Sequence, residues 1–297
     1  AAVTWVVQRP HAPPAAVLAV VPEPLPAAPA PAPPPPATFE ALPPQPAVAV
    51  IRGNPAAPMV ALTFDACSTT RFVGWEERVA EVLERFEVPA TVFMGGRLVR
   101  ERPELAQRLA DNPLFDLQNH TYVHPHLPEI PPSRVVSELE ETDRAVFDAT
   151  GRRAFMFRPP FGEYSTEVVK AATAAGYLPI QFDVASGDPD PGFHWGKIVE
   201  SVVTQVKPGS IVVMHANGNG FHTAEALPLL IGTLRARGFR LATVPQVLAG
   251  GGWSTDDGRK GPRRAVPAKG ATAAAATGTG NPAAGDGTSE RVVAPPV

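Results

Sequence analysis

Short apolar runs alternate with amphipathic segments through the middle of this chain. The runs at residues 60–64 and 90–94 are continuously apolar and partly β-branched, which is typical of strands buried on both faces. Further runs of this kind predict strands at residues 115–119, 154–157, 178–182, 209–214 and 239–244.

Amphipathic segments with helical spacing separate these runs. Val79, Val82, Leu83 and Phe86 fall on one face of a predicted helix, with charged residues opposite. The predicted helices span residues 76–88, 103–110, 133–150, 165–176, 195–206 and 224–237. A repeated strand–helix order with apolar strands indicates an α/β fold with a parallel sheet. We therefore expect a parallel (β/α) barrel of about seven strands, distorted or incompletely closed.

Composition divides the chain into three parts. Many of the 37 prolines lie in residues 1–47, together with alanine and valine, which predicts a disordered, extended spacer. Residues 251–297 are rich in Gly, Ala, Thr and Pro and predict a disordered tail. Residues 48–250 remain as a single domain.

Charge and cysteine content restrict the classes of partner. The net charge is −3, without a basic stripe, so we expect no nucleic-acid partner. No stretch is long enough and apolar enough to span a membrane. Cys67 is the single cysteine and excludes an internal disulfide. A Pro/Ala spacer before an enzyme-like domain suggests a location in the cell envelope or outside the cell; the oligomeric state stays open.

Polar residues cluster directly after the predicted strands. These residues are Asp65, His120, Arg158, Asp188 and His215. The carboxyl ends of parallel strands open on one face of a barrel, so these side chains can converge although they lie far apart in sequence.

A pair of histidines provides a candidate metal site. His120 and His124 are four residues apart, and either one helical turn or a tight loop can direct both rings at one metal ion. Pro125 prevents a helix from continuing far beyond His124. His126 is a third candidate donor, although an outward position is equally consistent with its spacing.

With these segments in hand, residues 58–248 resemble the polysaccharide deacetylases of the NodB-homology family. Five segments match the motifs of that family in order: Thr63-Phe64-Asp65-Ala66-Cys67, His120-Thr121-Tyr122-Val123-His124, Arg158-Pro159-Pro160-Phe161-Gly162, Ser186-Gly187-Asp188-Pro189 and Ile211-Val212-Val213-Met214-His215. The fourth segment keeps the acidic residue of the motif and lacks its tryptophan. Five motifs in the right order are far more specific than any one of them.

The resemblance implies hydrolysis of an acetamide on an acetylated polysaccharide or oligosaccharide, and it implies a role for each matched residue. His120 and His124 would hold a divalent metal, Zn²⁺ first, with Co²⁺, Ni²⁺ or Mn²⁺ as alternatives. Asp65 would be the general base and His215 the general acid.

The same resemblance implies supporting roles. Arg158 and an acidic partner, Asp188 or Asp183, would orient Asp65 and His215. A backbone N–H near Phe161, after Pro160, would stabilise the oxyanion. His222 is a further candidate near the sugar site, with a loop position without function as the alternative.

Ala66 departs from the family pattern, in which a second aspartate completes the metal site. Asp65 could turn to the metal, Cys67 could supply a thiolate, or the two histidines could bind metal alone. The expectation adopted is a site of two histidines with Asp65 nearby.

Other functions within and outside the family are compatible with this sequence. They are removal of O-acetyl groups from xylan, hydrolysis of a cyclic amide as in allantoinase-like relatives, and a non-catalytic wall-binding module whose metal site has decayed. The retention of Asp65, both motif histidines, Arg158 and His215 argues against the last of these.

Overall fold

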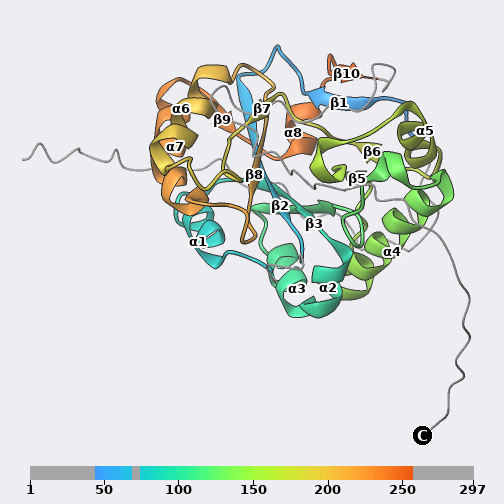
Figure 1. The fold of residues 1–297 in the computed structure, drawn as a ribbon. Helices are drawn as coiled ribbons and strands as arrows, with labels where there is room; N and C mark the ends of the chain where they lie inside the picture. Colours follow the sequence, from blue (N-terminus) through green and yellow to red (C-terminus); the bar gives the residue numbers. More distant parts are fainter. Residues whose placement is uncertain (1–43, 69–73, 257–297) are drawn as a thin grey trace, which may run out of the picture.

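The computed structural model of the protein describes residues 44–68 and 74–256 (Figure 1). Most of the spacer predicted over residues 1–47 and of the tail predicted over residues 251–297 lies outside the described residues. Within the described part of the chain, no helix combines the length and apolar character that a membrane crossing requires.

A curled parallel sheet forms the centre of the molecule, and it confirms the predicted fold class. Its strands follow the order β6-β5-β4-β3-β2-β8-β7. The strands are β2 (Met59–Ala66), β3 (Ala90–Met94), β4 (Phe115–Asn119), β5 (Met156–Phe157), β6 (Leu178–Pro179), β7 (Val184–Ala185) and β8 (Ile211–His215). A further strand, β9 (Arg240–Leu241), pairs in parallel with the first residues of β2.

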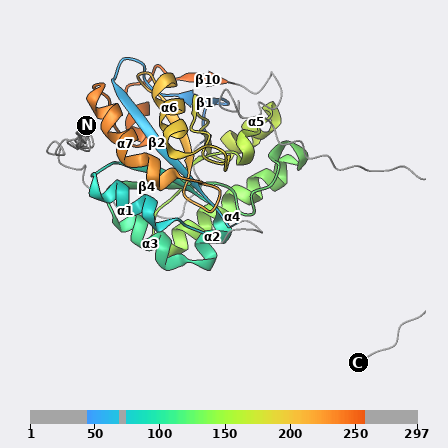
Figure 2. The same cartoon turned by 60° about the vertical axis from the view of Figure 1, so that its left-hand side comes forward.

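Helices cover the outside of this sheet, as the two views of the ribbon show (Figures 1 and 2). The helices are α1 (Glu77–Arg85), α2 (Gly96–Glu101), α3 (Pro103–Asp111), α4 (Pro132–Thr150), α5 (Thr166–Ala174), α6 (Trp195–Gln205), α7 (Thr223–Ala236) and α8 (Val244–Leu248). Two short 3-10 turns, η1 (Leu127–Glu129) and η2 (Pro160–Gly162), follow β4 and β5.

The barrel is open between its two edge strands. β6 and β7 are consecutive in sequence but lie at opposite edges of the sheet. Residues 180–183 connect them, and Ile180 forms an isolated parallel bridge with Val50 in β1 (Ala49–Arg52). The expectation of an incompletely closed barrel is confirmed, because the two edges do not pair with each other among the described residues.

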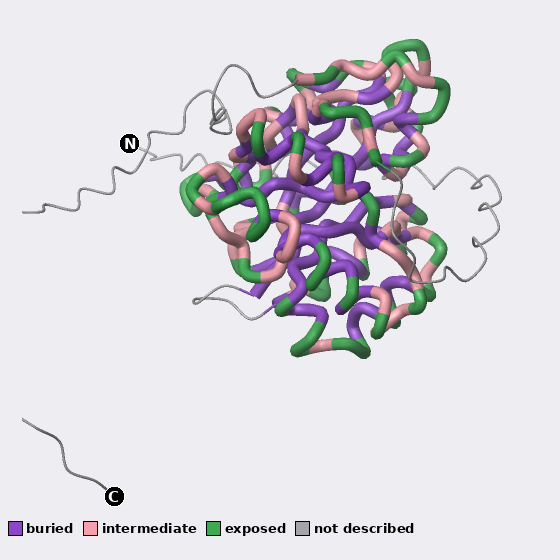
Figure 3. Tube along the Cα trace, turned by 90° about the vertical axis from the view of Figure 1, so that its right-hand side faces the viewer, coloured by how far each residue is buried: buried purple, intermediate pink, exposed green. Residues whose placement is uncertain are grey.

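Strand β2 passes through the middle of the core, and its alternation determines what each face carries. All eight of its residues are buried. Leu62, Phe64 and Ala66 belong to the large apolar cluster formed with the surrounding helices. Met59 and Ala61 belong to a second cluster inside the curled sheet. Successive side chains of a strand point to opposite faces, so Thr63 and Asp65 share the inner face. Figure 3 shows the buried strands inside and the exposed segments around them.

Several elements lie beyond those predicted from the sequence. α2 has Gly95 as its N-cap and Gly96 as its first residue, although glycine disfavours helix, and it is stabilised by the burial of Leu98 and Val99. β10 (Ser254–Asp256) pairs antiparallel with β1, so ordered structure continues past the predicted domain boundary at residue 250. Both elements depend on tertiary partners that local sequence does not reveal.

Candidate active site

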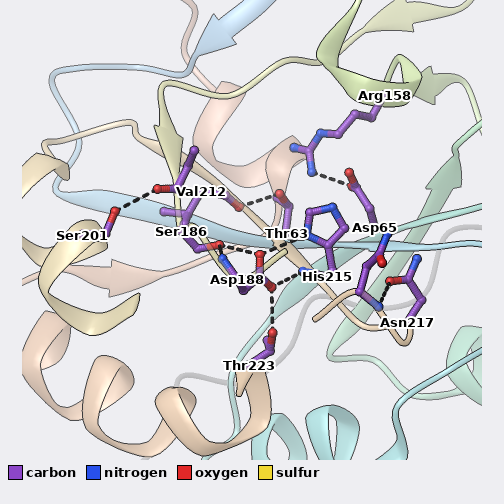
Figure 4. A network of polar contacts seen from close by, with 12 residues as sticks. Thr63, Asp65, Arg158, Ser186, Asp188, Ser201, Val212, His215, Asn217 and Thr223 are labelled. Atoms are coloured by element: carbon purple, nitrogen blue, oxygen red, sulfur yellow. Dashed lines mark hydrogen bonds and ion pairs between the residues drawn. The ribbon is translucent and has the colours of Figure 1, made fainter. Parts of the chain in front are cut away.

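The polar residues predicted to converge do lie together at the carboxyl ends of the strands. Asp65 is next to last in β2, His215 ends β8, His120 follows β4 and Arg158 follows β5. Asp65 and His215 are register partners on neighbouring parallel strands, so their side chains start from adjacent positions on one face. Figure 4 shows Asp65, Arg158, His215 and Asp188 close to one another.

Asp65 is the central carboxylate of this group. It is 6% exposed. Its Oδ1 accepts a hydrogen bond from Arg158 Nη1 at 2.8 Å, and its Oδ2 lies 3.8 Å from His120 Nε2. Burial raises the pKa of Asp65, but the positive charge of Arg158, together with His120 and His215, lowers the pKa below its ordinary value. The carboxylate is therefore ionised near neutral pH, with Oδ2 directed toward the histidine.

Arg158 is buried and forms hydrogen bonds with two other residues of the site, Asp65 and His120. Its guanidinium carbon lies 4.2 Å from the centre of the Phe93 ring, and its Nη1 holds Asp65. Its peptide oxygen is 2.9 Å from His120 Nδ1. A carbonyl oxygen can only accept, so His120 Nδ1 carries the proton and its Nε2 keeps a free electron pair.

The histidine pair lies on a tight loop rather than on a helix, which decides between the two geometries left open by the sequence. Thr121 and His124 adopt left-handed backbone conformations, with φ of 62° and 60°. Non-glycine residues tolerate this region when surrounding contacts compensate for it. The ring centroids of His120 and His124 are 4.9 Å apart, so the loop brings both imidazoles to one place.

Glu138 in α4 is a support for this loop that the sequence reasoning missed. The carboxylate is buried, and its Oε2 accepts hydrogen bonds from the backbone N–H groups of Tyr122 and Val123, each at 2.8 Å. Arg134 donates to its other oxygen at 2.6 Å. Its place on the inward face of a predicted helix was the signal that could have found it, since a lone buried acid requires partners.

The environments of the two loop histidines favour neutral rings. Burial, followed by the charge of His120, lowers the pKa of His124 to about 3. Burial also lowers the pKa of His120, although Asp65 opposes that effect. Neutral imidazoles can donate electron pairs to a metal, whereas imidazolium ions cannot.

His215 has the opposite environment. Its Nδ1 lies 3.0 Å from Asp188 Oδ1, and its backbone N–H donates to Asp188 Oδ2 at 2.7 Å. Ser186 and Thr223 each donate a hydroxyl to the same carboxylate at 2.7 Å. Burial lowers the pKa of His215, but the charge and hydrogen bond of Asp188 and the charge of Asp65 outweigh it, so the pKa is raised.

Two residues that the sequence offered as candidates for the site, Asp183 and His222, lie away from this group. Asp183 accepts from Ser210 Oγ and from the Ile211 N–H, at the amino end of β8, whereas His215 is at its carboxyl end. Of the two candidate partners, Asp188 is therefore the one that contacts His215. His222 is an exposed residue at the start of α7 and pairs with Glu225 at 2.6 Å; among the described residues it has no contact with the histidine pair.

Phe161 and Pro160 lie beside the histidine loop. The Phe161 ring is 47% exposed, and its centroid is 4.5 Å from that of His124. It stacks on His126 at 4.1 Å, and His126 Nδ1 pairs with Glu163 at 2.8 Å. Pro160 is buried, and Phe161 has a positive φ of 58°. His126 is therefore part of an aromatic pair at the rim of the site rather than a third donor beside His120.

Comparison with known proteins assigns the family. The model of the family described as "Polysaccharide deacetylase" matches residues 52–180 of this chain. A chitooligosaccharide deacetylase from Sinorhizobium fredii is 32% identical over 210 residues, which cover 66% of this chain and 95% of that protein. The chain belongs to the polysaccharide deacetylase family. The resemblance found in the five motifs is thereby confirmed.

Other known proteins are similar to this member of the polysaccharide deacetylase family at lower identity. The uncharacterized protein YlxY of Bacillus subtilis is 26% identical, and the match covers 71% of this chain but only 62% of YlxY. A CE4 family pseudoenzyme from Bacillus anthracis is 28% identical, with a TM-score of 0.59 over 70% of this chain and 69% of that chain. A mutant of that pseudoenzyme with restored enzymatic activity has a TM-score of 0.60 at 29% identity.

The residues of this family member fit a divalent metal. One donor atom from each of Cys67, His120 and His124 lies within 4.8 Å of the others. Imidazole nitrogen and thiolate sulfur are the donors that zinc accepts in proteins. The hydrogen bond from His120 to the Arg158 carbonyl fixes the ring so that Nε2 faces inward, which is the usual arrangement around a metal-binding histidine. The site can therefore hold a metal, and the identity of that metal belongs to the proposal below.

Proposed function

We propose that this protein is a metal-dependent hydrolase that removes acetyl groups from an N-acetylated polysaccharide of the peptidoglycan or chitin type. The observation that carries the proposal is the position of Asp65. One of its oxygens is held by Arg158, and the other faces His120, one strand away from His215. A base, an acid and a pair of neutral metal ligands thus surround one space, as amide hydrolysis requires.

Asp65 is the proposed general base. Oδ1 is occupied by the Arg158 hydrogen bond, so Oδ2 is the oxygen that takes the proton from the attacking water. The oxygen of that water forms the new bond to the acetyl carbon. Because the pKa of Asp65 is lowered, the carboxylate is available as a base at neutral pH.

His215 is the proposed general acid. Asp188 holds Nδ1, which leaves Nε2 to donate a proton to the sugar nitrogen as the C–N bond breaks. The products are then acetate and a free amine. The raised pKa of His215 keeps the ring protonated to higher pH than an ordinary histidine, so the proton is present when the leaving group needs it.

The loop histidines are the proposed metal ligands. A divalent metal held by His120 and His124, with zinc as the first candidate, would polarise the acetyl carbonyl and lower the pKa of bound water. The backbone N–H of Phe161 is the proposed second donor to the oxyanion, since Phe161 lies against His124. The role of Arg158 is to orient Asp65 and, through its carbonyl, His120.

The surroundings of the site support a sugar substrate outside the cytoplasm. Phe161 and its stacked partner His126 are both exposed at the rim, so an outer face of this stack can pack against a sugar ring. The similar protein from Sinorhizobium fredii is a chitooligosaccharide deacetylase. Together with the Pro/Ala-rich composition of residues 1–47, this supports a location in the cell envelope or beyond it.

One experiment tests the proposal directly. Metal content and acetate release are measured on the same preparation, with chitooligosaccharides, peptidoglycan fragments and acetylated xylan as substrates. We expect acetate from an N-acetylated substrate, and loss of that release in Asp65→Asn with metal retained. Release only from xylan would identify an O-acetyl esterase instead, and equal activity of Asp65→Asn would contradict the role of the base.

A non-catalytic module is the second candidate, and two observations favour it. Ala66 replaces an aspartate of the family motif, and the protein is similar in fold to a pseudoenzyme of the CE4 family. Metal binding without acetate release from any of the three substrates would support this candidate. The hydrogen bond from Arg158 to Asp65 and the hydrogen bonds that Asp188 accepts favour the enzyme, because a site without catalysis gains nothing from a buried arginine–aspartate pair.

A further inference from the structure

Ala66 cannot serve as a metal ligand, and strand β2 shows which neighbouring residue can. Phe64 and Ala66 are completely buried in the cluster between the sheet and the helices. The side chain of residue 66 therefore points away from the histidine loop. By alternation, the residues before and after it point to the other face, so Asp65 and Cys67 are both directed toward the site.

Cys67 reaches the histidine pair because a glycine, Gly95, directly follows the neighbouring strand β3. A Cβ atom on Gly95 would lie 3.0 Å from Cys67 Cβ and 3.6 Å from the Thr121 carbonyl oxygen. A side chain at this position would therefore separate the end of β2 from the histidine loop. Without one, Gly95 N–H bonds to the Ala66 carbonyl and Gly96 N–H bonds to the Thr121 carbonyl. This close approach brings the thiol beside the two imidazoles.

Burial and the charge of Asp65 raise the pKa of the Cys67 thiol to about 12, so its thiolate would form only when a metal displaces the proton. Cys67 is 4% exposed, and its Sγ accepts a hydrogen bond from Asn217 Nδ2 at 3.3 Å. The ligand atoms of Cys67, His120 and His124 lie within 4.8 Å of one another. Tetrahedral zinc with ordinary bond lengths would hold such atoms roughly 3.5 Å apart, so an adjustment of about an ångström closes the site.

We propose that Cys67 is the third protein ligand of the metal, so that this family member has a cysteine–histidine–histidine site. The inference rests on the metal dependence proposed above and adds the identity of the third ligand. It selects Cys67 among the three alternatives that Ala66 leaves open, in place of the expected site of two histidines with Asp65 nearby. A thiolate ligand favours zinc and other thiophilic metals over Mn²⁺ or Mg²⁺, which prefer oxygen.

The single cysteine of the chain makes the test unambiguous. Metal-free protein is prepared with a chelator under reducing conditions and given one equivalent of Co²⁺. We expect a near-ultraviolet thiolate-to-cobalt charge-transfer band, which only Cys67 can produce. On the zinc-loaded wild type, X-ray absorption should show one sulfur neighbour at about 2.3 Å; this measurement needs no variant.

Two variants test whether the charge-transfer band and the zinc affinity both depend on Cys67. In Cys67→Ser the band should disappear, and zinc affinity measured by chelator competition should fall by about 100-fold or more, since the loss of even an outer-shell partner costs up to that much. His222→Ala, which removes an exposed histidine, should leave both unchanged. Circular dichroism confirms that each variant is folded.

The outcomes separate this inference from the proposed function. Tight binding that requires His120, without a charge-transfer band or a sulfur neighbour, would overturn the cysteine ligand and leave a metal-dependent deacetylase intact. Failure of the wild type to bind Co²⁺ or Zn²⁺ at all would overturn both. A band that is lost in Cys67→Ser supports the cysteine ligand even if no substrate is turned over.

Discussion

The two histidine environments of this site are built in opposite ways. His215 is bound on its Nδ1 side by a carboxylate that itself accepts from two hydroxyls and a backbone N–H. His120 and His124 approach each other and Cys67 without direct hydrogen bonds among the three. The pKa of His215 is raised, and that of His124 is lowered to about 3. The chain alone completes the hydrogen bonding of His215, the proposed acid, whereas the histidine loop would be completed only by the metal proposed above.

The largest expected effect comes from removing a histidine of the loop. His120→Ala removes a proposed metal ligand and the neighbour of Asp65 Oδ2. We expect loss of bound metal and a fall in acetate release on the order of 10³-fold, as for loss of the main oxyanion stabiliser. Metal analysis and initial rates check this. Unchanged metal content and unchanged activity would show that the pair has another role.

The next largest effect is expected from removing the imidazole of His215, the proposed general acid. His215→Ala should keep the metal and reduce kcat by about 10²- to 10⁴-fold, which is the usual contribution of a general acid. Metal content and kcat are measured together. If His215→Ala lost its metal along with its activity, the two sides of the site would not be independent, and the contrast drawn here would fail.

A smaller effect concerns pH. Asp188 raises the pKa of His215, so activity that needs protonated His215 should persist above the ordinary histidine pKa and fall as pH rises further. Asp188→Asn removes the raising charge, and the alkaline limb of kcat/KM against pH should move to lower pH. Asp183→Asn is the matched control because Asp183 lies at the other end of β8. An alkaline limb that stays in place in Asp188→Asn would contradict the pairing.

The smallest effect tests the support of the histidine loop. Glu138→Gln keeps the size of the side chain but weakens the acceptor that holds the Tyr122 and Val123 N–H groups. Metal affinity should fall by about 10- to 100-fold, with kcat at saturating metal less affected. Glu141→Gln is the control on the same helix, since Glu141 is exposed and contacts only the Arg134 side of the network. Equal affinities of both variants would remove Glu138 from the site.

The order of strands and helices was predictable because it depends on local periodicity. The apolar run of β2 and the spacing of Val79 and Leu83 in α1 report burial directly, and both elements formed where predicted. The short edge strand β7 and the terminal strand β10 were not predicted. Strands of two or three residues owe their existence to the pairing partner, as β10 does to β1, and such pairing leaves no local pattern.

The sequence by itself determined the inventory of the site: a carboxylate, three imidazoles, a guanidinium and a second carboxylate, each near the carboxyl end of a strand or in the loop after it. Residue type and motif order are written in the chain, so these required no coordinates. Only the tertiary structure decided the partners. Asp188 rather than Asp183 contacts His215, and Glu138 holds the histidine loop. Cys67 rather than Ala66 faces that loop, because strand alternation and the glycine at the end of β3 are properties of packed neighbours.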